Sequence, residues 1–321
     1  MDDLVSIIVP CYNASSTIIR CLDSIEAQEY NNFQIVIVDD CSTDDTVIVI
    51  HDYINKGHDN IILVENKKNC GPSFSRKHGI EVSDGDIVAF VDSDDYVEND
   101  YISSMIEKMN GDGSNIVVCD YFTVDPKGNK RLKSMGLLPF SADATTNIVY
   151  NVDSMCLMLI RRELFQNISF PDLRNGEDMA IIPQLFVKAK SISYVNKPLY
   201  NYVYSSSSLS NGFNTRVLSS LKESYKIIHQ ALYDEFPLEV EYLSIRNYLY
   251  GALLHLLKNT FDRKTANEII SDFERIYPCW WTNKYIIKMP SYKRVFLTFV
   301  RYKCWTAVHF MCFIHKVVNR G

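Results

Sequence analysis

Four short apolar runs, separated by segments with helical periodicity, dominate the N-terminal part of the sequence. The runs lie at residues 5–9, 34–38, 61–64 and 86–91. Helices are expected between them, at 15–27, 44–54 and 72–83. Continuous apolar strands that alternate with helices are typical of a sheet that is covered on both faces. The sequence therefore predicts an α/β fold with a Rossmann-like, mostly parallel sheet and helices on both faces.

The character of the sequence changes near residue 210. Strand-like runs stop there, and helices are expected at 215–234, 238–259, 265–277 and after Pro290. A chain of 321 residues has room for one large α/β domain and an extension. We therefore predict a first domain at 1–212 and a helical C-terminal region at 213–321.

Acidic and aromatic residues follow the strand-like runs directly. They are Pro10, Cys11, Tyr12 and Asn13 after the first run, Asp39 and Asp40 after the second, and Asp92, Asp94 and Asp95 after the fourth. In an open parallel sheet, ligands bind at the carboxyl ends of the strands. One aspartate at such a position can be the N-cap of the next helix. Five carboxylates on one rim repel one another, so a cation or a donor-rich ligand is expected to offset them. Oxygen ligands without Cys or His suit Mg²⁺ or Mn²⁺.

Four blocks of this sequence, taken together, resemble the signature of the family 2 glycosyltransferases. The blocks lie at 5–13, 38–42, 69–76 and 90–95. Their order and spacing match the family over about residues 4–110, and a weaker match continues to about residue 210. The resemblance implies a GT-A fold, with a donor-binding half at about 1–110 and an acceptor half at about 111–212.

The resemblance also implies roles for single residues on the donor side. Pro10, Tyr12 and Asp40 match positions that hold the nucleotide base, and Asn13 adjoins them. Arg76 matches a basic residue that approaches the donor, although Lys77 stands where the family usually has Asn.

The acidic block at 92–95 is similar to the family's DxD motif. Asp92 matches the position near the ribose, and Asp94 matches the position that holds the divalent ion on the diphosphate. Asp95 adjoins Asp94, so all three aspartates are expected around Mg²⁺ or Mn²⁺.

The segment 175–178, Asn-Gly-Glu-Asp, resembles the family's acidic block with the catalytic base. Inverting transfer requires a carboxylate that takes the proton of the acceptor hydroxyl. We therefore predict Asp178 as the base, with Glu177 orienting it or contacting the acceptor. The alternative is that Asp178 caps a helix at 179–188. The family's Trp-Asn-Lys-like segment is replaced here by Cys156, Leu157 and Met158, so the acceptor is not defined by the resemblance.

The resemblance implies an inverting glycosyltransferase that uses a nucleotide-sugar, with a UDP-sugar expected. The acceptor would be a glycan or a lipid-linked saccharide, as in cell-surface polysaccharide synthesis. One alternative is a sugar-phosphate nucleotidyltransferase, which would need a Gly-rich loop after the first strand; residues 10–13 contain no glycine. Another is an inactive sugar- or partner-binding module, although the acidic residues needed for activity are all present.

The C-terminal tail differs in charge from the rest of the chain. Nine Lys and Arg residues and no acidic residue follow Glu274, while the whole chain carries a formal charge of −6. The tail also holds all three tryptophans, Trp280, Trp281 and Trp305. A basic, aromatic segment is typical of contact with an anionic membrane surface. The alternative is a helix that packs on the protein with a solvated basic edge.

One long helix after Pro290 would carry a basic stripe on a single face. The residues of this expected stripe are Arg294, Thr298, Arg301, His309 and Lys316.

Other features concern the location of the protein. The N-terminus has no basic region with a cleavage site, and no apolar stretch approaches the roughly 20 residues that span a bilayer. Nine scattered cysteines without C-x-x-C spacing predict reduced thiols in the core. The net charge gives no reason to expect a nucleic-acid partner. We therefore expect a cytoplasmic protein, peripheral on the inner face of the cell membrane.

Overall fold

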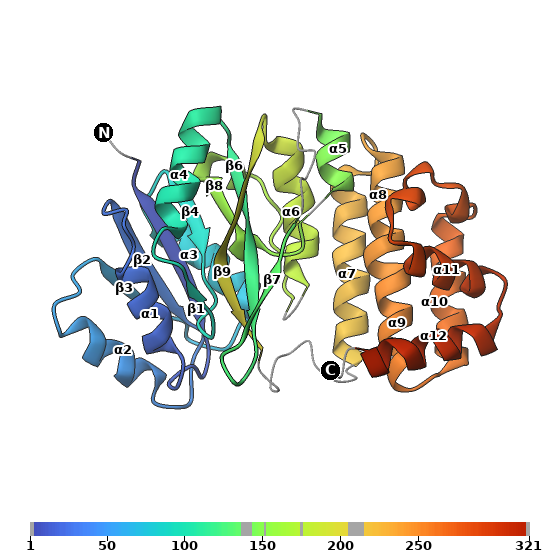
Figure 1. Cartoon of the computed structure of the whole chain (residues 1–321), viewed down its shortest axis with the longest axis horizontal. Coiled ribbons are helices and arrows are strands. Elements are labelled where there is room, and N and C mark those ends of the chain that lie inside the picture. The colour runs from blue at the N-terminus through green and yellow to red at the C-terminus, as the bar shows by residue number, and fades with distance from the viewer. Residues whose placement is uncertain (1–2, 136–142, 151, 174–175, 205–214, 319–321) are drawn as a thin grey trace. The chain divides into compact units, whose positions relative to one another are not determined.

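The computed structural model describes residues 3–135, 143–150, 152–173, 176–204 and 215–318. The chain forms two compact units, Met1–Ser208 and Leu209–Gly321. They are called unit 1 and unit 2 below (Figure 1). The boundary expected at 212/213 and the predicted site neighbour Asn175 lie outside the described residues.

A single sheet forms the centre of unit 1. Its strands in the described residues are β1 (Val5–Cys11), β2 (Phe33–Asp39), β3 (Ile61–Glu65), β4 (Ile87–Phe90), β5 (Tyr96–Val97), β6 (Ile116–Val124), β7 (Lys130–Lys133), β8 (Met158–Arg161) and β9 (Ile192–Val203). Their order is β3-β2-β1-β4-β8-β6-β9-β5, with β7 added to β6. This arrangement confirms the predicted α/β class.

The first four strands in the order form the parallel part of the sheet. β1 pairs in parallel with β2 and with β4, and β2 pairs in parallel with β3. All seven residues of β1 are buried, as expected of a strand with covered faces. Because these strands point the same way, the loops after β1, β2 and β4 meet at one edge of the sheet.

Beyond β4 the sheet is mixed, so the expectation of a mostly parallel sheet holds only for its first part. β8 runs antiparallel to both β4 and β6, whereas β6 and β9 are parallel. Strand β9 also pairs antiparallel with the two-residue strand β5, which follows the acidic block 92–95. The parallel prediction rested on strands before residue 92, and it could not anticipate how later strands would add to the sheet.

Helices cover the sheet of unit 1. They are α1 (Ile18–Glu26), α2 (Thr46–Ile54), α3 (Pro72–Val82), α4 (Tyr101–Asp112), α5 (Ala144–Val149) and α6 (Glu177–Lys188), with short 3₁₀ helices η1 (Met155–Leu157) and η2 (Arg162–Phe165). The first three fall within the ranges that the sequence predicts. Helix α3 packs against β1 and β2. Its Gly79 lies so close to β1 that an added Cβ would sit 2.4 Å from Ile8 Cγ2.

Unit 2 contains helices joined by short turns, and its described residues include no strand. Its helices are α7 (Thr215–Leu232), α8 (Pro237–Leu243), the π-helix η3 (Ser244–Leu249), α9 (Tyr250–Asn259), α10 (Arg263–Ile276), the 3₁₀ helices η4 (Trp280–Thr282) and η5 (Lys284–Lys288), α11 (Ser291–Arg301) and α12 (Trp305–Val318). Tyr225 stacks on Tyr248 at 5.2 Å between ring centroids, within a cluster that includes Phe273. None of the described helices is both long and apolar enough to cross a membrane.

The C-terminal tail departs from the single helix expected after Pro290. Helices α11 and α12 are separated at Tyr302–Cys304, where Lys303 has φ +54°. The stripe proposed from Arg294 to Lys316 is therefore wrong as one continuous helical face. Trp280 and Phe296 are also buried. All nine cysteines are free, as predicted, but Cys41, Cys279 and Cys304 are exposed, so they are not the core thiols that were expected.

Candidate active site at the carboxyl ends of the strands

Tyr12 and Asn13 follow β1, and their side chains lie in different environments. The Tyr12 side chain is 48% exposed, so its ring faces are accessible to a flat ligand. Asn13 adopts φ +52° and links the loop after β1 to the loop after β2. Its backbone N–H donates to Ser42 Oγ at 2.9 Å, and its Oδ1 accepts from the Thr43 N–H at 2.8 Å. Asn13 therefore holds the backbone beneath Tyr12 in place.

Asp40 is buried at the end of β2 and anchors the Gly-rich block to the sheet. Its carboxylate accepts from the N–H groups of Cys70 and Gly71, at 2.8 and 2.6 Å, and from Asn66 Nδ2 at 2.9 Å. Three of the roughly four acceptor positions of a carboxylate are thus occupied. The predicted contact of Asp40 with a base would have to use the remaining one.

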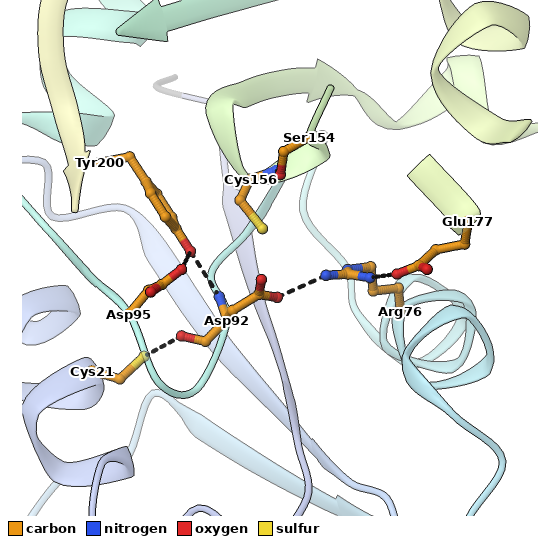
Figure 2. A network of polar contacts seen from close by, with 8 residues as sticks. All are labelled: Cys21, Arg76, Asp92, Asp95, Ser154, Cys156, Glu177 and Tyr200. Atoms are coloured by element: carbon orange, nitrogen blue, oxygen red, sulfur yellow. Dashed lines mark hydrogen bonds and ion pairs between the residues drawn. The ribbon is translucent and has the colours of Figure 1, made fainter. Parts of the chain in front are cut away.

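Arg76 lies between Asp92 and Glu177 (Figure 2). Its Nη2 is 2.7 Å from Asp92 Oδ1, and its Nη1 pairs with Glu177 Oε1. Arg76 is only 4% exposed, and these two carboxylates keep its pKa well above the usual value against the effect of burial. One cation thus joins the end of β4 to the first turn of α6, a link that the sequence did not predict.

The Asp95 side chain is directed toward β9. It is 1% exposed, its Oδ1 accepts from the Val203 N–H at 2.7 Å, and its Oδ2 accepts from the Tyr200 hydroxyl at 2.7 Å. Burial, followed by repulsion from Asp92 and Asp94, raises the pKa of Asp95 to about 8. Both of its oxygens therefore serve contacts within the protein.

Asp94 is the exposed carboxylate of the acidic block. Its backbone carbonyl accepts a hydrogen bond from Arg20, which fixes the main chain while the side chain faces outward. Among the described residues, no group of three or more His, Cys, Asp or Glu is arranged to hold a metal ion. Mg²⁺ commonly uses one or two protein carboxylates together with substrate phosphates and water. The donor chemistry of Asp94 fits such an open site, and a cage formed by protein alone is not present in the described part of the chain.

Asp178 lies in the first turn of α6, one residue after the helix begins. The N-cap is Gly176, with φ +75°, so the alternative role of Asp178 as the helix cap is wrong. Its Oδ1 is buried and has no hydrogen-bond partner among the described residues. Burial raises the pKa of Asp178 to about 7, although the charge of Arg76 opposes this shift. A carboxylate with a pKa near neutrality suits proton transfer.

Two residues of this site escaped the sequence analysis. Tyr200 bonds to both Asp95 and the backbone of Asp92, and Cys21 Sγ donates to the carbonyl of Asp92 at 3.6 Å. A tyrosine in a buried strand requires a partner for its hydroxyl, and this was the one signal that could have pointed to it. Nothing in the spacing of Cys21 pointed to the acidic block.

The α/β fold and the acidic residues at the strand ends agree with the class of the glycosyltransferases, and a family match establishes that class. The family model for glycosyl transferase family 2 matches residues 6–169, about half of the chain. The chain belongs to that family, which confirms the resemblance and sets aside the nucleotidyltransferase alternative.

Curated relatives and solved structures agree with this membership. The chain is 29% identical over 244 residues to glycosyltransferase GlyA of Streptococcus pneumoniae, a match that covers 70% of this chain and 34% of GlyA. It is 29% identical over 227 residues to the putative glycosyltransferase EpsH of Bacillus subtilis, covering 67% of this chain and 65% of EpsH. The chain thus spans about a third of GlyA and just under two thirds of EpsH.

Among solved structures, residues 1–349 of Staphylococcus aureus TarS in complex with UDP-GlcNAc have a similar fold. The TM-score is 0.74 at 21% identity, and the match covers 97% of this chain and 91% of that chain. This likeness confirms the predicted GT-A fold with a helical C-terminal region.

Proposed function

We propose that this protein is an inverting glycosyltransferase that moves a sugar from a UDP-sugar to a hydroxyl of a glycan or lipid-linked saccharide. The observation that carries the proposal is Asp178, which has a pKa near 7 and a buried carboxylate oxygen with no hydrogen-bond partner in the described part of the chain. The choice of UDP is supported by TarS, which is named a poly(ribitol-phosphate) beta-N-acetylglucosaminyltransferase and is solved with UDP-GlcNAc. The same relative supports a role in cell-surface polysaccharide synthesis.

Asp178 acts as the general base in this proposal. The acceptor hydroxyl gives its proton to the Asp178 carboxylate while its oxygen attacks the anomeric carbon of the donor. The bond from that carbon to the diphosphate oxygen breaks, and the electron pair leaves with the nucleoside diphosphate. Attack opposite the leaving group inverts the configuration at the anomeric carbon.

Glu177 and Arg76 support Asp178 through charge. Glu177 precedes Asp178 in the helix and pairs with Arg76. This pair fixes the positions of the charged groups next to the base. Arg76 lowers the pKa of Asp178 while burial and Glu177 raise it. This balance keeps a substantial fraction of Asp178 ionised at neutral pH, as a base requires.

The donor nucleotide is held at the ends of β1 and β2 in this proposal. The exposed ring of Tyr12 stacks on the base, beside the buried Pro10. The remaining acceptor position of Asp40 takes a base N–H. Asn13 contributes indirectly, because it holds the loop that carries Tyr12. Asp92 approaches the ribose.

The diphosphate is accompanied by Mg²⁺ or Mn²⁺ in this proposal, with Asp94 as the main protein ligand. The ion would supply charge stabilisation for the leaving diphosphate. Asp92 already pairs with Arg76 through one oxygen, and both oxygens of Asp95 accept hydrogen bonds. The three aspartates therefore contribute unequally, although the sequence placed all of them around the metal.

The test is turnover of UDP-, GDP- and dTDP-sugars by the purified chain, measured as release of nucleoside diphosphate with Mg²⁺ or Mn²⁺ present. We expect release from a UDP-sugar, and a large loss in Asp178→Asn once an acceptor is supplied. Binding of a UDP-sugar without turnover under any acceptor or metal would support the inactive binding module instead.

We also propose that unit 2 contacts the anionic inner surface of the cell membrane. Phe310, Phe313 and Ile314 are exposed on α12 at the spacing of one helix face, in a segment with no acidic residue after Glu274. Exposed apolar side chains beside Lys and Arg are typical of interfacial binding. Trp280 and Phe296 are buried, so these two aromatic residues of the tail are not available for membrane contact.

A further inference from the structure

A cavity of about 240 Å³ opens in unit 1 beside Asp92 and Asp95. The residues that line it are Asp92, Asp95, Tyr121, Thr123, Met135, Asp153, Ser154, Cys156, Leu157, Tyr200 and Tyr202. Most of them lie after residue 110, outside the donor motifs, and have no role in the mechanism above. The mechanism proposed above therefore does not explain this cavity.

Two parallel strands build one wall of this cavity. In the pairing of β6 with β9, Tyr121 is in register with Tyr200, and Thr123 with Tyr202. Side chains two residues apart on a strand share a face, and paired positions of neighbouring strands share it too. These four residues consequently form a two-by-two patch of three tyrosines and one threonine.

Polar groups line other parts of the cavity. Asp92 and Asp95 follow β4, Asp153 and Ser154 precede η1, and Cys156 lies within η1. The start of η1 is fixed locally because Ser154 Oγ accepts from the Cys156 N–H at 3.2 Å (Figure 2). The cavity thus combines aromatic faces with hydroxyl and carboxylate oxygens, a combination that suits the apolar faces and hydroxyl edges of a sugar ring.

The charge of the lining restricts what the cavity can hold. Three of its described lining residues are aspartates, and none is Lys, Arg or His. Asp95 is largely protonated at neutral pH because its pKa is raised to about 8, so Asp92 and Asp153 supply the negative charge. Arg76, which pairs with Asp92, also pairs with Glu177 and so has little charge to offer a further anion. Burial is the main reason why the pKa of Tyr121 is raised, and the charge of Asp153 adds to this rise, so that charge reaches the tyrosine wall of the cavity. A ligand that brings a carboxylate or phosphate here would be repelled.

We propose that this cavity is a subsite for a single uncharged sugar ring and that it discriminates against sugars bearing a carboxylate or phosphate. Its volume is below the roughly 300–1,000 Å³ of sites for larger ligands, so it fits one ring better than an oligosaccharide. The inference rests on the proposed function and names its substrate class. The ring belongs either to the donor or to the acceptor, and the test separates these sources.

The donor arm compares neutral donors with the uronate donors of the same ring configuration, by calorimetric titration with Mg²⁺ present. The probes are UDP, UDP-glucose with UDP-glucuronate, and UDP-galactose with UDP-galacturonate. If the donor sugar occupies the cavity, the neutral donor with the higher affinity binds at least about tenfold more tightly than its uronate. Asp153→Asn then narrows that ratio several-fold, and Tyr202→Ala weakens the neutral donor while leaving UDP affinity unchanged.

The acceptor arm uses saturation-transfer NMR with methyl β-glucoside and methyl β-galactoside, each compared with its uronide, with and without UDP. If the acceptor sugar occupies the cavity, neutral glycosides receive saturation, uronides do not, and Tyr202→Ala removes the effect. Leu132→Ala, an exposed change on β7 outside the lining, is the control and should alter neither arm.

The subsite is overturned if uronates bind as well as neutral sugars in both arms, or if Tyr202→Ala changes neither arm. Failure of UDP itself to bind contradicts the proposed function instead. The glycoside arm without UDP still tests the cavity in that case, so the two failures remain distinguishable.

Discussion

The Tyr200 hydroxyl donates to Asp95 Oδ2 at 2.7 Å and accepts from the Asp92 N–H at 3.2 Å. One side chain of β9 thus fixes both ends of the acidic block that follows β4. Asp95 completes the connection by accepting from the Val203 N–H. The position of Asp94, which lies between the two fixed residues, depends on contacts made more than a hundred residues later in the chain.

Replacing Tyr200 by Phe should therefore make the position of residues 92–95 less fixed without removing a carboxylate. The change leaves buried polar groups of Asp92 and Asp95 without a partner, a cost of about 1–3 kcal/mol in the free energy of unfolding. We expect this loss in urea denaturation together with a higher KM for the UDP-sugar. Tyr302→Phe, at a 64% exposed position, is the control. Wild-type stability and KM in Tyr200→Phe would contradict the role of the hydroxyl.

Arg76→Ala should be strongly destabilising because it leaves Asp92 and Glu177 without their shared cation. Breaking a buried ion pair by removing one partner costs about 3–5 kcal/mol. The comparison is Lys77→Ala, whose exposed pair with Glu81 is worth less than about 1 kcal/mol. Urea denaturation of both variants tests the difference. Equal effects would show that the Arg76 pairs contribute little.

Asp94→Ala should abolish turnover while the protein stays folded, because Asp94 is exposed and its backbone rather than its side chain bonds to Arg20. Chelator should likewise abolish turnover of the wild-type protein, and added Mg²⁺ or Mn²⁺ should restore it. Nucleoside diphosphate release and thermal unfolding are the two readouts. Undiminished turnover in excess chelator would rule out the metal.

The rate of transfer should rise with pH through about 7, where Asp178 loses its proton. Below this pH the raised pKa leaves Asp178 protonated, and a protonated carboxyl cannot accept the acceptor's proton. Asp178→Asn should lower the transfer rate by about 10²- to 10⁴-fold and remove this rise, with donor affinity nearly unchanged. A pH–rate profile of both proteins provides the measurement. A variant that keeps most of its rate would place the base elsewhere.

Binding to anionic vesicles should depend on the exposed aromatics of α12. We expect the double variant Phe310→Ser and Phe313→Ser to co-sediment less than wild type, and added salt to weaken the attachment of both. Ile48→Ser, at an exposed site on α2 in unit 1, is the control. Point variants are preferable to removing residues 275–321, since Trp280, Phe296 and Val300 are buried. Equal binding by all variants, or none by wild type, would contradict membrane contact through α12.

The local pattern of apolar residues in the sequence predicts much of the secondary structure of unit 1. The four apolar runs became β1 to β4 because each is a continuous apolar segment between helical ones. The burial of Ile18, Cys21, Leu22 and Ile25 on α1 follows from their spacing in the same way. In the tail, no Pro or Gly marks the break at Lys303, so local pattern did not predict it.

The pairings of the site could not be derived from local pattern. Arg76 and Glu177 are 101 residues apart, and Asp95 and Tyr200 are 105 apart. Such contacts depend on how the later strands add to the sheet, and no strand after residue 91 was assigned from the sequence. The family resemblance supplied the identities of the acidic residues, but their partners required the structure.

The close approach of Gly79 to Ile8 has a consequence for protein engineering. A programme that raises helix stability by replacing glycines with alanine would select this position, because the exchange favours an isolated helix by about 1 kcal/mol. Here the new methyl group would meet Ile8 Cγ2 at 2.4 Å and Val38 Cγ2 at 3.3 Å, and α3 would have to move away from the sheet. Arg76 lies one turn earlier on the same helix and would be displaced with it. In a mutational scan, Gly79 would then tolerate substitution as poorly as a residue with a reactive group, although it has no side chain.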